Sequence, residues 1–209
     1  MSLPNKPLGE RPAVVDPEVI EHDVDVLIVG GGMAACGTAF EIKKWAPADM
    51  KITLVDKASM ERSGAVAQGL SAINTYIGPE QDPADYARMV SNDLMGITRD
   101  DLAYDLGRHV DESVHLFEEW GLPIWKTDEN GERFDGSKGM ASLKDGGKPV
   151  RSGKWQIMIN GESYKWIVAE AAKKAIGPER IQERVFIDKL INDKNDPSRV
   201  AGAIGFSVR

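Results

Sequence analysis

Apolar residues along the chain form short runs separated by stretches with helical spacing, which predicts an α/β fold. The runs Val24–Val29 and Ile52–Asp56 have the length of buried strands in a parallel sheet. Between them, the stretch from Ala34 to about Trp45 predicts a helix that ends before Pro47. Strand, helix and strand in this order form one βαβ unit. We therefore expect a Rossmann-like parallel sheet flanked by helices.

Three later segments also have the apolar spacing of helices. The segment Pro83–Asn92 is short and amphipathic, and Asp82 is its predicted N-cap. A further helix is expected near Glu162–Ile176, because a Gly-Pro stop signal follows it. Between these two, Thr98 is another predicted N-cap. It precedes an apolar stripe that we expect to pack in the core, formed by Leu102, Leu106, Val110, Val114 and Phe117.

The remaining segments complete the predicted organisation. Arg184–Asn192 and Arg199–Val208 predict a C-terminal β-hairpin, and the polar, glycine-rich residues 127–147 predict turns or an exposed loop. Because the last element is a strand without a return, we expect a truncated or partial polypeptide. We expect residues 1–23 to form an extended arm and residues 24–209 to form one partial domain, with a helical and loop insertion at about 83–160.

A glycine motif follows the first predicted strand and has the spacing of a dinucleotide site. Gly30 and Gly32 permit a tight turn that a pyrophosphate can approach, and Ala35 lets the next helix lie close to the sheet. The start of that helix offers free N–H groups to phosphates. Asp56 ends the second strand, where a carboxylate can accept hydrogen bonds from a ribose diol. Together these features predict dinucleotide binding.

The segment Lys57–Thr75 is rich in glycine, alanine and serine. Small side chains suit a backbone that lies against a large flat ligand, where bulk would clash. The alternative is an ordinary connecting loop, although loops rarely contain so many small apolar residues. An NAD site would also suit the glycine turn, but it would leave this segment without a purpose.

Composition and charge exclude several other classes of protein. The 209 residues carry a net charge of −7 with no basic stripe, which argues against nucleic-acid binding. No apolar run approaches the ~20 residues that span a bilayer, and no signal peptide is visible, so we expect a cytoplasmic location.

Cys36 is the only cysteine, so the chain has no internal disulfide or cysteine-ligated cluster. We interpret Cys36 as a small buried residue. The three histidines do not form a ligand set, and we expect no metal site.

The segment Glu61–Asn74 resembles the flavin-binding segment of the fumarate reductase/succinate dehydrogenase flavoprotein superfamily. Within this superfamily, the chain is most similar to the alpha subunits of dissimilatory adenylylsulfate reductases. The similarity covers nearly everything after Asp23. It is also carried by the segments Gly30–Met33, Asp111–Trp125, Trp155–Lys165 and Val200–Arg209.

The resemblance implies an FAD site and assigns residues to it. Relatives that bind FAD covalently carry a histidine where this chain has Ser63, so non-covalent FAD is implied. An aspartate at position 56, where many relatives have glutamate, can still reach the ribose. The implied cofactor-binding residues are Gly30, Gly31, Gly32, Met33, Ala34, Ala35, Asp56, Lys57, Ser63, Gly64, Gln68, Gly69, Leu70 and Ser71, with Phe186 or Ile187 at the adenine.

The resemblance also implies a reaction, the reversible two-electron reduction of adenylylsulfate to sulfite and AMP through a flavin N5–sulfite adduct. Asn74 is the implied catalytic residue, and its alternative role is a turn residue that bonds local backbone. Arg151 and Trp155 are weaker candidates for the substrate channel. Electrons are implied to come from a ferredoxin-like iron–sulfur beta subunit with two clusters.

Two other functions remain open on the sequence alone. One is a fumarate reductase or L-aspartate oxidase type of flavoprotein, which would bind a dicarboxylate. The other is a catalytically incomplete FAD-binding fragment, because the groups that clamp the substrate in this family are expected beyond Arg209.

Overall fold

The computed structural model describes residues 16–78, 80–134 and 141–208. Residues 1–15 of the predicted arm and residues 135–140 of the predicted loop lie outside this range. The elements in chain order are β1 (Val26–Val29), α1 (Met33–Trp45), β2 (Ile52–Asp56), the 3-10 turns η1 (Met60–Arg62) and η2 (Ala65–Gln68), β3 (Ala72–Asn74), α2 (Pro83–Asp93), α3 (Asp100–Gly107), α4 (Val110–Glu119), β4 (Lys126–Thr127), β5 (Arg133–Phe134), β6 (Arg151–Gly153), β7 (Gln156–Met158), α5 (Gly161–Ile176), η3 (Pro178–Arg180), β8 (Ile181–Glu183), β9 (Val185–Asn192) and β10 (Val200–Ser207).

A parallel sheet with strand order β1-β2-β8 forms the base of the domain. Strand β1 pairs with β2 from Val26↔Ile52 to Val29↔Val55, and β2 pairs with β8 from Leu54↔Ile181 to Asp56↔Glu183. The α/β fold and the βαβ unit predicted from the sequence are therefore confirmed. The carboxyl ends of β1 and β2 lie at the same edge, as parallel strands require.

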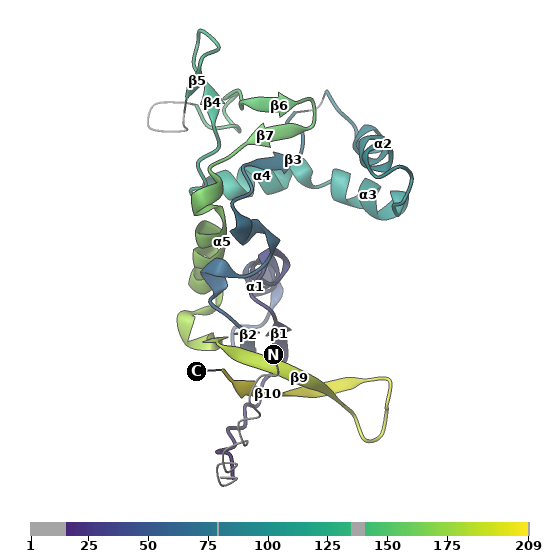
Figure 1. Cartoon of the computed structure of the whole chain (residues 1–209), viewed down its shortest axis with the longest axis vertical. Helices are drawn as coiled ribbons and strands as arrows, with labels where there is room; N and C mark the ends of the chain where they lie inside the picture. The colour runs from purple at the N-terminus through teal and green to yellow at the C-terminus, as the bar shows by residue number, and fades with distance from the viewer. Residues whose placement is uncertain (1–15, 79, 135–140, 209) are drawn as a thin grey trace, which may run out of the picture.

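Helices α1 and α5 pack against each other and form the main core with the sheet (Figure 1). Small residues make this approach possible, because Ala39 of α1 and Ala169 and Ala172 of α5 are completely buried. Asn160 is the N-cap of helix α5, and its side chain accepts hydrogen bonds from the backbone N–H groups of Glu162 and Ser163. The helix stops before Gly177, its C-cap, as the sequence predicted.

A second layer lies at the far end of α5 from the parallel sheet (Figure 1). Strands β3, β7 and β6 form an antiparallel sheet there, and β4 pairs with β5. Helix α2 begins at Asp82, which caps the N–H of Asp85 as predicted. Helices α2 and α3 pack together and reach away from the rest of the molecule.

The helix expected after Thr98 is two helices, and Thr98 is not its N-cap. Helix α3 follows Arg99 without a side-chain cap, and the chain turns at His109 before α4 begins. A residue distant in the sequence stabilises this turn, because the Tyr76 hydroxyl donates to the Gly107 carbonyl at 2.8 Å. The predicted core stripe is correct only in its second half. Val110 and Val114 are buried, whereas Leu102 and Leu106 are 58% and 57% exposed.

The C-terminal β-hairpin is confirmed. Strands β9 and β10 are antiparallel over nearly their whole length, with two irregularities in the register. The start of the hairpin lies against the parallel sheet, because β9 contacts β2. Just before β9, the N–H of Arg184 donates at 3.2 Å to the carbonyl of Ala58, which follows the end of β2. Its far end projects away from the body of the molecule (Figure 1).

A substitution at the start of α5 tests the close approach of this helix to the loop after η2. A Cβ atom on Gly161 would lie 2.5 Å from the Leu70 carbonyl oxygen and 2.7 Å from that of Gly69. Because both atoms belong to backbone, we expect Gly161→Ala to lower the free energy of unfolding by about 1–3 kcal/mol. Denaturant titration measures the change. Gly153→Ala is the matched control, since its Cβ would meet nothing within 4 Å. Equal losses for both variants would contradict the packing described here.

The phenol of Tyr164 provides a test of core burial by pH. Burial raises the pKa of Tyr164 from 10.0 to about 12. The folded state holds this proton more tightly than the unfolded state does. The contribution of Tyr164 to the free energy of unfolding is therefore fully present below pH 10 and is lost as the pH rises towards 12. The loss is at most about 3 kcal/mol, since one pKa unit corresponds to about 1.4 kcal/mol. Unfolding measured across this range in the wild type and in Tyr164→Phe should show a steeper decline for the wild type, and parallel curves would refute the assignment.

Candidate functional site: the glycine turn and its cradle

The predicted glycine turn connects β1 to α1 and is held by Asp56. Gly30 has a φ of +104°, which glycine adopts without strain. The N–H of Gly31 donates to Oδ1 of Asp56 at 3.1 Å, and a Cβ on Gly31 would lie 2.8 Å from Cγ of that carboxylate. Asp56 is only 4% exposed. The end of β2 therefore fixes the conformation of the turn after β1.

Helix α1 starts directly at this turn, with Gly32 as its N-cap and no side chain capping it. Its first N–H groups have no partner from a capping side chain, as an anion-binding helix start requires. Cys36 lies in the first turn of α1, and its thiol donates to the Gly31 carbonyl at 3.5 Å. Burial raises the pKa of the Cys36 thiol, so it is neutral at physiological pH. This agrees with the interpretation of Cys36 as a small buried residue.

Residues 63–71, which we call the cradle, lie beside the glycine turn. The Ser63 hydroxyl donates to Oδ2 of Asp56, so one carboxylate binds both the turn and the cradle. Gly64 has a φ of +83°, and its Cβ would lie only 2.9 Å from Cα of Gly32. The two segments therefore meet backbone to backbone. Most of the cradle is exposed beyond this contact, including Gln68, Gly69, Leu70 and Ser71.

Charged groups that the sequence analysis did not select hold η1, the 3-10 turn that leads into the cradle. The Glu183 carboxylate, at the end of β8, accepts a hydrogen bond from the N–H of Met60 at 2.8 Å. Lys173 of α5 forms an ion pair with Glu61, which lowers the pKa of the Glu61 carboxyl. The buried ammonium of Lys165 donates to the Met60 carbonyl. Lys165 could have been noticed because it interrupts the apolar side of α5, whereas neither glutamate has a local signal.

A cleft of about 460 Å³ is lined by residues of η1, the cradle and the start of α5. Arg62 and Ala67 line one side of it, and Gly161, Ser163 and Trp166 line the other. The hydroxyl of Ser163 is buried there without a hydrogen-bond partner.

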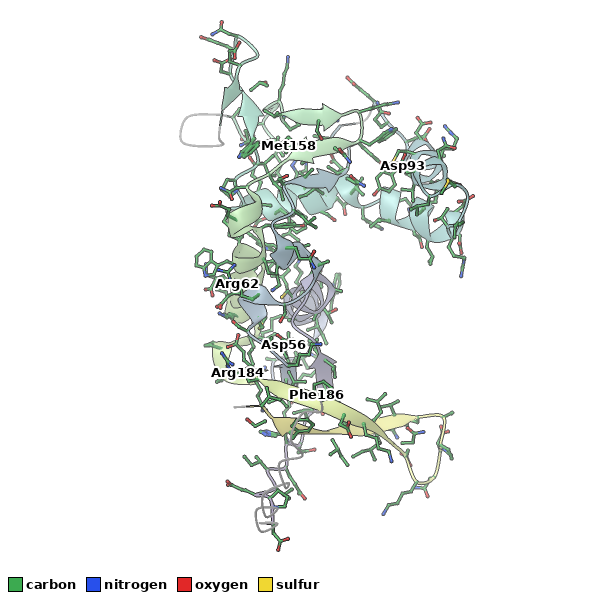
Figure 2. The ribbon with its side chains drawn as sticks, viewed as in Figure 1. Asp56, Arg62, Asp93, Met158, Arg184 and Phe186 are labelled. Atoms are coloured by element: carbon green, nitrogen blue, oxygen red, sulfur yellow. The ribbon has the colours of Figure 1, made fainter. Side chains whose placement is uncertain are left out.

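The other predicted site residues are spread over the molecule. Lys57 is exposed directly after Asp56, whereas Asn74 ends β3, where it pairs with Gln156 of β7. Figure 2 labels Asp56, Arg184 and Phe186 at the end of the molecule opposite Met158 of β7. The Phe186 ring packs against Phe206 across the hairpin, with 5.4 Å between centroids. Ile187 follows it in β9.

The two weaker candidates for the substrate channel have structural contacts. Arg151 is exposed, and its guanidinium donates to the Lys154 carbonyl at 2.8 Å. Trp155 packs edge-on against Tyr76 and Tyr86. These contacts give both residues a structural role, and their place in a substrate channel stays a prediction.

A family model for an FAD binding domain matches residues 25–207, which include the glycine turn, Asp56 and the cradle. The chain belongs to this FAD-binding domain family. Its cofactor is FAD, and the residues present fit it. The start of α1 has no capping side chain, the turn has no room for a Cβ at Gly31, and the adjoining surface consists of small residues.

Individual relatives are similar over nearly the whole chain. The adenylylsulfate reductase subunit alpha of Megalodesulfovibrio gigas is 62% identical over 213 residues, which is 99% of this chain and 32% of that protein. The solved adenylylsulfate reductase of Archaeoglobus fulgidus has a TM-score of 0.74 at 55% identity, covering 88% of this chain and 27% of its own. A solved adenosine-5-phosphosulfate reductase in complex with sulfite, described as a covalent adduct, matches equally well.

A more distant match shows the fold alone. The E. coli quinol fumarate reductase has a TM-score of 0.63 at 16% identity, covering 87% of this chain and 29% of its own. In the described residues of this FAD-binding domain, no helix is both long and apolar enough to cross a membrane. The same residues contain no group of three His, Cys, Asp or Glu side chains placed to hold a metal ion.

The contact between Gly31 and Asp56 generates a prediction for FAD binding. A methyl group on Gly31 must displace the Asp56 carboxylate, so we expect Gly31→Ala to weaken FAD binding by about tenfold or more. Fluorescence titration with FAD measures the affinity. Gly37→Ala, in the helix that follows the turn, is the control because its Cβ would meet nothing within 4 Å. That variant should keep its FAD affinity, and an equal loss in both variants would show that Gly31 has no special role.

Proposed function

We propose that this FAD-binding domain belongs to the alpha subunit of an adenylylsulfate reductase, which catalyses the reversible two-electron reduction of adenylylsulfate to sulfite and AMP. The observation that carries the proposal is 62% identity to such a subunit over 99% of this chain. The chain spans about a third of the length of that relative, so the activity is assigned to the whole protein.

The residues of the turn and the cradle have distinct roles in this proposal. The start of α1 at Met33 and the turn Gly30–Gly32 bind the pyrophosphate of FAD, since no side chain caps the helix. Asp56 accepts hydrogen bonds from the adenosine ribose. The ribityl chain and the flavin ring lie along the exposed cradle, and the first residues of β9 contact the adenine. The glycine and serine backbone of the cradle can approach a flat ring closely.

The reaction breaks the bond between the sulfur and the AMP oxygen, and the sulfur accepts two electrons. FAD bound in its two-electron-reduced form would supply that electron pair and would itself be oxidised. In our proposal, the Asn74 amide donates a hydrogen bond to an oxygen on the sulfur and holds the group in line for reaction. Its exposure at the end of β3 leaves the side chain accessible to a substrate.

The identity of residue 63 favours this reaction over succinate oxidation. Succinate dehydrogenases carry a histidine that bonds covalently to FAD at this position, and this chain has Ser63. Ser63 instead donates to Asp56, which leaves no nucleophile there for the flavin. The proposed FAD is therefore non-covalent.

The proposed partner is a ferredoxin-like iron–sulfur beta subunit with two clusters. It is supported by the name of the 62% identical relative, an alpha subunit, which implies a second subunit. The proposed location is the cytoplasm.

The experiment uses the whole protein, of which this chain is a part. It is given AMP, sulfite and a one-electron acceptor, and both adenylylsulfate formation and reduction of the acceptor are followed. We expect both products in equal electron equivalents and no reduction of fumarate by the chemically reduced protein. Reduction of fumarate without adenylylsulfate formation would overturn the proposal in favour of a dicarboxylate flavoprotein.

Substitution of Asn74 tests its proposed role within that assay. We expect Asn74→Ala to lower kcat by about 10²-fold while FAD affinity stays unchanged, since the amide contacts the reacting group and not the cofactor. Asn130→Ala removes the same side chain from the β4–β5 turn and serves as the control. Equal turnover in the two variants would leave Asn74 as a turn residue only.

A further inference from the structure

Lys165 is an almost completely buried lysine that reaches the lining of the cleft, beside Glu61 and Arg62. Its side chain is on α5, which packs against α1, and the residue is only 3% exposed. Its ammonium donates to the Met60 carbonyl and lies 3.7 Å from Sγ of Cys36. No carboxylate within residues 16–78, 80–134 and 141–208 forms an ion pair with it.

The neighbouring acids do not neutralise this charge by contact. The Cys36 thiol is protonated, because burial raises its pKa more than the lysine lowers it. The Glu61 carboxylate is paired with Lys173, and the Asp56 carboxylate is bound by the Gly31 amide and by Ser63. A buried ammonium bonded to a neutral carbonyl and a thiol reduces the stability of a fold. The position therefore requires another explanation than stability.

The charge lies directly behind the glycine turn. Cys36 separates Lys165 from the turn, since its thiol donates to the Gly31 carbonyl and its N–H donates to the Gly32 carbonyl. The ammonium thus faces the start of α1 from the protein side, with one small side chain between them. Because Cys36 and Lys165 are both buried, protein and not water lies between the ammonium and the turn, so the charge acts over this separation more strongly than it would in water.

We propose that Lys165 is a positioning residue for the cofactor, and that its buried ammonium stabilises the pyrophosphate of FAD electrostatically through the glycine turn. The ammonium makes no contact with FAD and acts together with the N–H groups of α1. The inference rests on FAD binding, and it is independent of which substrate the flavin reduces.

The proposal predicts that loss of the charge weakens FAD binding without lowering the stability of the apoprotein. Loss of a lysine with a purely structural role would lower the stability. In Lys165→Met, which keeps the length of the side chain without its charge, we expect FAD binding to weaken about tenfold or more. ADP, which carries the pyrophosphate without the flavin, should lose affinity to a similar degree in a competition assay. The apoprotein of this variant should melt at the same temperature as the wild type or higher.

Two further variants make the result decisive. Lys165→Arg keeps the charge and should retain FAD affinity within about threefold of the wild type. Lys174→Met removes an exposed charge from the same helix and should change neither quantity. An unfolded or less stable apoprotein in Lys165→Met, unchanged affinity for FAD, or a loss for FAD without a loss for ADP would each overturn the proposal. None of these measurements involves adenylylsulfate, so their outcome is separate from that of the turnover assay.

Discussion

The hydrogen bonds of the Asp56 carboxylate are the constraint on which the site depends. One oxygen accepts from the Gly31 amide and the other accepts from the Ser63 hydroxyl, so a single buried group joins the end of β2 to the glycine turn and to the cradle. Hydrogen bonds to a carboxylate are stronger than those between neutral groups, particularly away from water. These bonds lie within the chain, so the sheet, the helix start and the cradle keep fixed positions relative to one another without the help of a cofactor.

Much of this arrangement could be predicted from the sequence, because it depends on local rules. Strand length, the spacing of Gly30, Gly32 and Ala35, and the acid at the end of the next strand specify a βαβ unit whose geometry hardly varies. The cap at Asp82 and the stop at Gly177 mark helix ends through backbone chemistry of a few neighbouring residues. Such signals do not require knowledge of distant parts of the chain.

The features that could not be predicted depend on contacts between distant segments. The chain breaks between α3 and α4 because Tyr76, 31 positions away, bonds the Gly107 carbonyl, and no local signal reports that contact. Lys165 interrupts the apolar side of α5 in the sequence, but only the packing of α1 against α5 shows what its ammonium contacts. The site residues assigned by resemblance, Asn74 among them, stay predictions, since geometry alone does not show what a ligand contacts.

The hairpin of β9 and β10 has a consequence for the behaviour of the protein in solution. Val200, Ile204 and Phe206 of one strand are more than half exposed, on a ribbon that projects from the body of the molecule (Figure 1). A long apolar ribbon with open edges readily joins the ribbon of another molecule. In a sample of this 209-residue chain by itself, reversible self-association should therefore increase with concentration, and light scattering, viscosity and sedimentation will depend on how much of the chain the sample contains.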